Sequence, residues 1–184
     1  MMPDPIRIYA AGPMPEYPAT AVGRHWRDLL EERFARIATS EPFMPEVRFS
    51  RPDAAGCDHG GFDAEQVVLA DFALIDGVDG VLVYLPRRDL YGSHVEIGYA
   101  VAQSIPVLVY DAAGSVDWEA RGTGHQCTCM SDFSPYWFAG TAAHRHSRGG
   151  SWHQASPRKS VEQHVAEMAE IVAQWVATPA RRRA

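Results

Sequence analysis

The sequence has no asparagine, only three cysteines and no long apolar run among its 184 residues. Cys57, Cys127 and Cys129 are an odd number without the spacing of a disulfide scaffold, which indicates reduced thiols. No apolar stretch approaches the roughly 20 residues that a membrane-spanning helix needs, and the N-terminus lacks the segments of a secretory signal. We therefore expect a cytoplasmic protein with no membrane partner.

Clustered basic residues are also scarce, because the net charge is −6 and the one basic cluster is Arg181–Arg183. An extended surface for a nucleic acid polymer needs grouped Lys and Arg side chains, so we expect no such partner. With 46% hydrophobic and 22% charged residues, the chain has the composition of one globular domain spanning residues 1–184.

Strand-like and helix-like segments alternate along the chain, which predicts a parallel α/β sheet. The expected strands are 6–13, 47–50, 80–85 and 106–110, and the expected helices are about 20–37, 63–75, a short helix around residue 96, and 160–176. Between about 111 and 157 no regular period is sustained, so we expect an irregular insertion there, with a short strand near 137–141.

The segment Tyr91–Ala100 places one acidic residue, Glu96, between two apolar strands. We expect Glu96 in the first turn of the intervening helix, where the helix dipole and unpaired backbone N–H groups favour an ionised carboxylate. An ionised carboxylate is suited to attack on carbon rather than to proton donation. The structural alternative is a carboxylate that only stabilises the helix start, by about 0.3–1 kcal/mol.

Ligands of such sheets bind beyond the carboxyl ends of the strands, where three segments of this chain should converge. These segments are the turn Ala11–Pro13, the loop 86–93 and the loop after Asp111. Tyr9, near the end of the first strand, could hydrogen-bond Glu96, and Asp71 could supply a second carboxyl group. Two acids in different environments suit glycosyl transfer, in which one attacks the anomeric carbon and the other handles a proton.

Each of these residues also has a purely structural interpretation. Asp71 could be a solvent-facing residue of an ordinary amphipathic helix, and Tyr9 could be a core-edge aromatic residue. Ser93 could cap the helix, a role that is compatible with ligand binding. Arg24 and His25 could reach a phosphate or lie on a solvated helix face.

Three groups of residues follow one another in the first 110 residues or so. They are Tyr9–Pro13, which matches a Tyr-x-Ala-Gly-Pro turn, then Asp71 with Asp79 and Val81–Val83, then Gly92–Ala100 followed by Pro106–Val107. This ordered set resembles the nucleoside 2-deoxyribosyltransferases and the related nucleotide N-glycosidases. The resemblance implies a single-domain, doubly wound, flavodoxin-like α/β fold, with about five parallel strands and helices on both faces.

The resemblance also implies a retaining double displacement on a nucleoside or nucleotide, without a cofactor. Glu96 would be the nucleophile that binds the sugar, Asp71 would help to protonate the departing base, and Tyr9 would position the nucleophile. The sugar, expected to be 2′-deoxyribose, then passes to a free nucleobase in the transferases or to water in the hydrolases. A homo-oligomer is expected, because the family's sites are completed by a neighbouring subunit. The substrate-binding residues that we predict are Gly12, Pro13, Arg24, Asp89, Gly92, Ser93 and His94.

Two departures from the family pattern concern the choice between transfer and hydrolysis. Six residues before the nucleophile, the transferases have Asp and the nucleotide hydrolases have Ser, whereas this chain has Leu90. Asp89 could substitute if the loop is shifted by one residue. The transferases also borrow an Asn from a neighbour, and this chain has none. Three hypotheses stay open: transfer to a base, hydrolysis of a nucleoside 5′-monophosphate, and a nucleotide-binding sensor without turnover.

The expected insertion carries two further groups of residues. Tyr136–Phe138 could stack on a nucleobase or pack in a core. The other group consists of soft metal ligands whose spacing fits no standard zinc pattern, so we predict no metal site. Its members are His125, Cys127, Cys129, His144 and His146.

Overall fold

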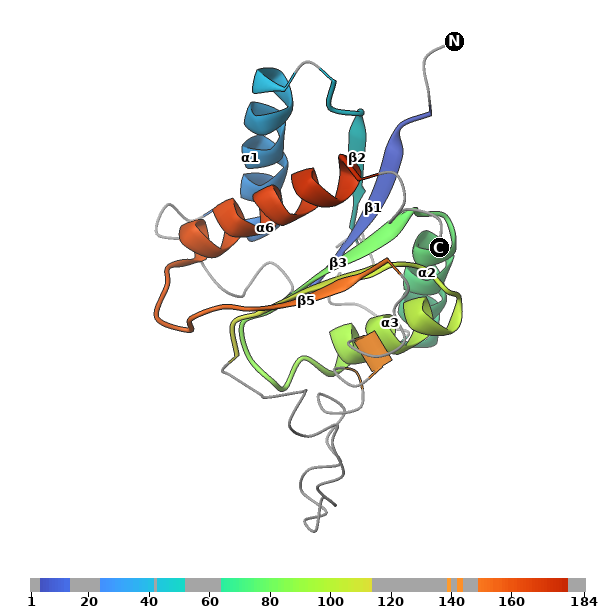
Figure 1. The fold of residues 1–184 in the computed structure, drawn as a ribbon. Coiled ribbons are helices and arrows are strands. Elements are labelled where there is room, and N and C mark those ends of the chain that lie inside the picture. Colours follow the sequence, from blue (N-terminus) through green and yellow to red (C-terminus); the bar gives the residue numbers. More distant parts are fainter. Residues whose placement is uncertain are drawn as a thin grey trace, which may run out of the picture.

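A five-stranded, all-parallel sheet forms the centre of the protein (Figure 1). The computed structural model describes residues 4–13, 24–41, 43–51, 64–113, 139, 142–143 and 149–178. The strands are β1 (Ile6–Ala11), β2 (Val47–Ser50), β3 (Gly80–Leu85), β4 (Val107–Asp111) and β5 (Ser151–Gln154), in the order β2–β1–β3–β4–β5. The chain adds β2 on one side of β1 and β3 on the other. The strand order therefore reverses between β1 and β3, where such sheets bind their ligands.

Helices cover both faces of this sheet, which confirms the predicted doubly wound, flavodoxin-like fold (Figure 1). In the described part of the chain, α1 (Trp26–Ser40) and α6 (Val161–Val176) pack on one face. The helices α2 (Ala64–Asp76) and α3 (Tyr91–Ala102) lie on the other face. None of the described helices is long and apolar enough to cross a membrane.

Alternating side chains of the central strands divide the core into two apolar layers. Leu82 and Tyr84 of β3 face α1 and α6, whereas Val81 and Val83 face α2 and α3. All residues of β3 and β4 are buried, as expected for strands covered on both faces. β1 alternates in the same way, so that Tyr9 points into the layer of α2 and α3 while Ala10 points into the opposite layer.

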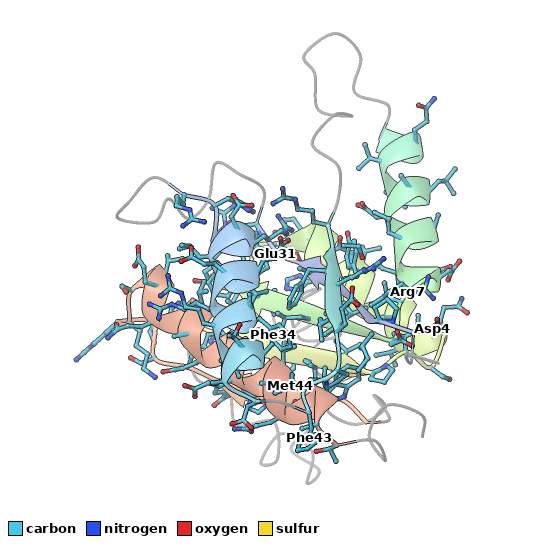
Figure 2. The ribbon with its side chains drawn as sticks, turned by 90° about the horizontal axis from the view of Figure 1, so that it is seen from above. Asp4, Arg7, Glu31, Phe34, Phe43 and Met44 are labelled. Carbon is cyan, nitrogen blue, oxygen red and sulfur yellow. The ribbon has the colours of Figure 1, made fainter. Side chains whose placement is uncertain are left out.

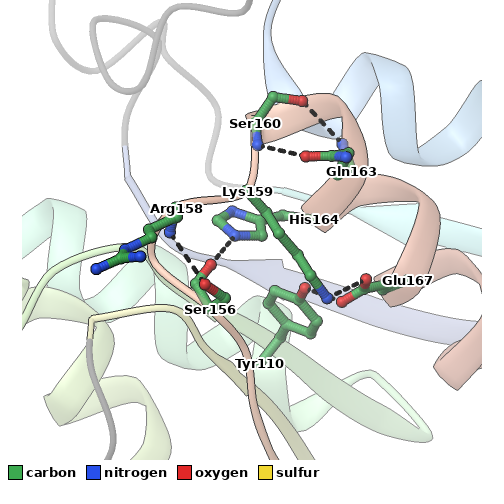
Figure 3. Close-up of polar contacts among 8 residues, drawn as sticks. All are labelled: Tyr110, Ser156, Arg158, Lys159, Ser160, Gln163, His164 and Glu167. Atoms are coloured by element: carbon green, nitrogen blue, oxygen red, sulfur yellow. Dashed lines mark hydrogen bonds and ion pairs between the residues drawn. The ribbon is translucent and has the colours of Figure 1, made fainter.

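The start of α6 is anchored by a capping box, in which the Ser160 hydroxyl accepts from the Gln163 backbone N–H and the Gln163 side chain accepts from the Ser160 backbone (Figure 3). This arrangement satisfies two backbone N–H groups that a helix start leaves unpaired. The predicted start of this helix at about residue 160 is therefore confirmed.

A second set of contacts ties α6 to the carboxyl ends of β3 and β4, and Figure 3 shows those that involve Tyr110 of β4 and Ser156. The Tyr84 hydroxyl lies 2.8 Å from Nδ1 of His164, and Nε2 of His164 lies 3.0 Å from the Ser156 carbonyl oxygen. Since that carbonyl only accepts, Nε2 carries the imidazole proton and Nδ1 accepts from Tyr84. Nearby, Tyr110 donates to Glu167.

Two sequence predictions about the elements are wrong. The predicted irregular insertion contains β5 at its end, which a short, mostly polar segment with no apolar run did not reveal. The strand predicted near 137–141 falls almost entirely outside the described residues. The second wrong prediction is the start of the first helix. It begins at Trp26 rather than near residue 20, because His25 has an extended backbone and caps it. The helix continues to Ser40.

Candidate active site

Tyr9 and Glu96 meet inside the layer between the sheet and α3. The Tyr9 hydroxyl donates a hydrogen bond of 2.6 Å to Oε1 of Glu96, and both side chains are buried. This contact confirms the pairing expected from the sequence. Tyr9 is the fourth residue of β1, so its position is set by the backbone of a strand with neighbours on both sides. A buried hydroxyl held this way orients one oxygen of the carboxylate.

Asp71 of α2 is the third member of this group. Its carboxyl also forms a hydrogen bond with Tyr9, and burial raises its pKa above the ordinary range while that bond lowers it. Asp71 is half-buried, so it is not a purely solvent-facing residue of α2. The phenol has a single proton, which it gives to Glu96. Asp71 and Glu96 therefore compete for one phenol proton, and burial raises the pKa of Asp71 more than the bond to Tyr9 lowers it.

Glu96 lies in the second turn of α3, so the prediction that it occupies the first turn is wrong. The helix begins at Tyr91, and its N-cap is Leu90, which forms no side-chain capping bond. Five helical residues precede Glu96, which removes it from the unpaired N–H groups that were expected to favour its ionised form. The helix-start stabilisation considered as the alternative is excluded by the same geometry.

Burial, rather than the helix dipole, controls the ionisation of Glu96. Burial raises its pKa from 4.5 to about 7, and the charge of Asp71 acts in the same direction. The hydrogen bonds from Tyr9 and Ser93 and the charge of Arg27 lower the pKa and offset part of this effect. The surroundings of Glu96 therefore do not favour the ionised form as the sequence analysis expected, and near pH 7 both forms of Glu96 are populated.

Ser93 does not cap α3, contrary to one prediction from the sequence. It is the third residue of the helix and is buried. Its side chain hydrogen-bonds Glu96, which lies three residues further along the same helix. Tyr9 and Ser93 thus hold the carboxyl group from the sheet and from its own helix. Two donors on one carboxylate fix its direction more strongly than one donor would.

The turn after β1 lies beside this group and is tightly packed. Gly12 has a φ of +146°, and a Cβ atom at this position would lie 2.9 Å from Cζ2 of Trp26 and 3.0 Å from the Tyr84 carbonyl oxygen. Only glycine fits this backbone conformation and this spacing. The Pro13 carbonyl oxygen accepts a hydrogen bond of 3.1 Å from Nε1 of Trp26. The turn predicted as part of the site is thus a fixed piece of backbone at the carboxyl end of β1.

Arg27 is a residue of the site that the sequence analysis missed. It is buried, and its guanidinium donates hydrogen bonds to the carbonyl oxygens of Ala10, Gly12 and Pro13, at 2.8, 3.1 and 3.2 Å. Burial lowers its pKa to about 10, while the charge of Glu96 raises it, so the side chain is cationic near neutrality. The available signal was its spacing from Leu30, because residues 27 and 30 lie on one face of the helix, and that face is buried.

Several predicted substrate-binding residues point elsewhere or have other partners. Arg24 lies just before α1 and forms an exposed ion pair of 2.6 Å with Glu32 of that helix, which agrees with the solvated position that was the alternative prediction. Asp89 is exposed and pairs with Arg87 at 3.0 Å, while Leu90 packs against the α2–α3 layer. The one-residue shift that would let Asp89 replace a polar residue at position 90 is therefore not found.

His94 and Gly92 remain near the start of α3. Burial lowers the pKa of His94 to about 4, so its imidazole is neutral near pH 7 and its ring packs edge-on to Tyr91. Gly92 is exposed, and a Cβ atom there would have open space around it. His25 caps α1 through Nδ1, and burial lowers its pKa, which disfavours the charged form that a phosphate would attract.

The His and Cys residues of the segment 125–146 and the aromatic residues Tyr136–Phe138 lie outside the described residues. Within the described ranges, no group of three or more His, Cys, Asp or Glu side chains is placed to hold a metal ion.

Comparisons with protein-family models, with curated proteins and with solved structures gave no match to this chain.

Proposed function

We propose that this protein cleaves or exchanges the N-glycosidic bond of a 2′-deoxynucleoside or its 5′-monophosphate. The observation that carries the proposal is the buried contact between Tyr9 and Glu96, with Asp71 on the same phenol. Two carboxyl groups lie at the point where the strand order reverses, and glycosyl transfer uses such a pair as nucleophile and proton donor. The resemblance of the same residues to the nucleoside 2-deoxyribosyltransferases and nucleotide N-glycosidases supports this choice of substrate.

In the proposed reaction the ionised Glu96 carboxylate attacks the anomeric carbon of the sugar. A carbon–oxygen bond forms as the carbon–nitrogen bond to the base breaks, and the electron pair moves to the base nitrogen. Asp71, whose pKa is raised by burial, gives its proton to the departing base. Tyr9 holds the attacking carboxylate in place. A nitrogen of an acceptor base, or a water molecule, then attacks the same carbon, gives its proton to the Asp71 carboxylate, and releases Glu96 as a carboxylate.

The raised pKa of Glu96 has a cost and a benefit for this mechanism. Near pH 7 only part of the protein has the ionised nucleophile, because the pKa is about 7. A carboxylate with a higher pKa is also a more basic nucleophile. The sensor hypothesis uses the same buried group for binding alone, so turnover must be measured separately from binding.

The deciding experiment is incubation of the protein with a panel of 2′-deoxynucleosides and their monophosphates, with and without a free acceptor base, and analysis by chromatography. Glu96→Gln is expected to abolish base release. Glu170→Gln, which changes an exposed carboxylate on α6, serves as the matched control and should retain the wild-type rate. Sugar phosphate formed without an acceptor base would assign hydrolysis. Tight nucleotide binding with no base release would assign the sensor role.

We also propose a homo-oligomer in the cytoplasm. The helix α2 exposes Val68 and Leu69, and α3 exposes Val95, with exposed fractions of 43%, 58% and 52%. Figure 2 shows α2 standing at one side of the molecule, apart from α1. A helix that is apolar on its outer face usually packs against another surface, and a second copy of this chain is the simplest candidate.

A further inference from the structure

Arg27 carries a positive charge in a buried position. Its exposed fraction is 3%, and it occupies the second position of α1. Arginine is almost never buried this fully unless it is paired. Its guanidinium nitrogens all donate to backbone carbonyls, and the ion pairs of the described residues do not include it. Among the described residues, no carboxylate forms an ion pair with Arg27. Its positive charge therefore acts on Glu96 without a direct contact.

The three hydrogen bonds of Arg27 hold the backbone that follows Tyr9. They reach the carbonyl oxygens of Ala10, Gly12 and Pro13, and the guanidinium carbon lies 4.7 Å from the centre of the Trp26 ring. A planar fork of donors fixes several acceptors at once, which a lysine ammonium cannot do with the same geometry. The segment that carries the Tyr9 hydroxyl into the site is thus held from the opposite face of the sheet.

The charge of Arg27 also acts on the site. The groups that influence Glu96 are Tyr9 from β1, Asp71 from α2, Ser93 from its own helix and Arg27 from α1. Arg27 is the one cation among these four. Burial and the charge of Asp71 oppose the ionised form of Glu96, whereas the guanidinium favours it. The influence is mutual, because the charge of Glu96 favours the cationic form of Arg27.

We propose that Arg27 is a positioning residue for the Glu96 site, which holds the segment Ala10–Pro13 through three hydrogen bonds and supplies the positive charge that favours the Glu96 carboxylate. The inference rests on the proposed function, because Glu96 acts there as an ionised nucleophile. It assigns to α1, on the far face of the sheet, a part in chemistry that takes place between β1 and α3.

The first test measures the ionisation of Glu96 without any substrate. The free energy of unfolding is measured against pH for the full chain and for Glu96→Gln, and the difference between the two curves gives the midpoint of Glu96. The same pair is then prepared with Arg27→Gln and with Arg27→Lys. Arg27→Gln should raise the midpoint by about one pH unit, which is about a tenfold smaller ionised fraction below the midpoint. Arg27→Lys keeps the charge and should leave the midpoint near that of the wild type.

The second test measures turnover and separates the effect of the positive charge from the effect of the three guanidinium hydrogen bonds. Arg27→Lys should lower kcat several-fold with little change in KM, because the charge is kept and the fixed turn is lost. Trp26→Phe removes one hydrogen bond to Pro13 and part of the ring beside the Arg27 guanidinium, but it changes no charge, so the midpoint should stay near that of the wild type. An unchanged midpoint in Arg27→Gln would overturn the role of the charge. If Arg27→Gln does not fold, wild-type kcat in Arg27→Lys overturns the proposal and a several-fold loss supports it.

The two tests keep this inference distinct from the proposed function. If the wild type releases no base from any nucleoside or nucleotide, the proposed function fails, while the titration of Glu96 still decides whether Arg27 controls its ionisation. If base release is found and the midpoint does not respond to Arg27→Gln, the function stands and the inference fails.

Discussion

The Tyr9 hydroxyl donates a 2.6 Å hydrogen bond to Glu96 across 87 positions of sequence, and it does so in a layer where both side chains are almost completely buried. A strand residue and a helix residue are thus joined by one short polar contact inside an apolar layer. Polar groups are expensive to bury, and a buried carboxyl group is tolerated when donors surround it. Tyr9, Ser93 and Arg27 all favour its ionised form, from three different elements.

Glu96→Gln should stabilise the protein at neutral and alkaline pH while abolishing the proposed activity. The folded protein keeps a proton on Glu96 between pH 4.5 and about 7, whereas the unfolded chain releases it near 4.5. The free energy of unfolding of the wild type therefore falls as the pH rises through this window and levels off above it. A pKa raised to about 7 corresponds to a loss of about 3 kcal/mol.

The measurement is urea unfolding of wild type and Glu96→Gln at several pH values. Relative to the wild type, the free energy of unfolding of the variant should rise between about pH 4 and pH 8, by up to about 3 kcal/mol. Glu170→Gln, on the exposed face of α6, should follow the wild-type curve at every pH. Parallel curves for wild type and Glu96→Gln would show that Glu96 ionises in its ordinary range.

Tyr9→Phe should move the rising limb of the pH–rate profile to higher pH. The hydroxyl lowers the pKa of Glu96, so its removal raises that pKa above about 7 and reduces the ionised fraction near neutrality. A hydrogen bond to a charged group is worth about 1.5–3 kcal/mol, which corresponds to about a 10- to 100-fold loss in rate. Tyr99→Phe is the matched control, because the Tyr99 hydroxyl donates to Asp76 at the surface. An unshifted profile in Tyr9→Phe would contradict the positioning role.

The sheet could be predicted from the sequence because its inner strands are apolar on both faces, and Gly80–Leu85 is a continuous run of this kind. The pairing of Tyr9 with Glu96 could be expected because both lie near the carboxyl edge. The start of α3 could not, since Leu90 and Tyr91 give no capping signal. β5 is a short edge strand whose burial depends on its neighbours. The spacing of Arg27 from Leu30 places it on the buried face of α1, but its three carbonyl partners belong to a distant turn that the local pattern does not show.

Gly12→Ala should destabilise the protein and lower turnover together. The new methyl group would lie 2.9 Å from Cζ2 of Trp26 and 3.0 Å from the Tyr84 carbonyl oxygen, at a φ of +146° that alanine rarely adopts. A strained backbone position of this kind costs about 1–3 kcal/mol. Gly98→Ala is the matched control, because a Cβ atom there meets open space on the exposed face of α3. Urea midpoints decide the comparison, and equal stability of the two variants would refute the packing argument.

Tyr84→Phe should be more damaging than Tyr110→Phe, although both remove one hydroxyl from neighbouring strands. Without Tyr84, Nδ1 of His164 loses its partner in a buried position, which costs about 1–3 kcal/mol. Without Tyr110, Glu167 keeps its ion pair with Lys159 and its contact with solvent, so the loss should stay below about 1 kcal/mol. Urea unfolding of the two variants gives the comparison, and the reverse order would contradict the loss of stability assigned to the unpaired Nδ1 of His164.

Leu69→Glu should convert the proposed oligomer into single chains. Leu69 is the more exposed of the two apolar side chains on α2, and a buried, unpaired carboxylate at a contact between copies is strongly unfavourable. Ala35→Glu, on the exposed part of α1, places the same charge on a helix of the opposite face and should leave the mass in solution unchanged.

Light scattering after gel filtration gives the mass of each variant. Val68, the neighbouring exposed apolar residue, lies one helical turn before Asp71, so a contact at this surface borders the candidate site. The rate per chain of Leu69→Glu should therefore fall with the loss of the oligomer, whereas a wild type that is monomeric would exclude α2 as a contact between copies.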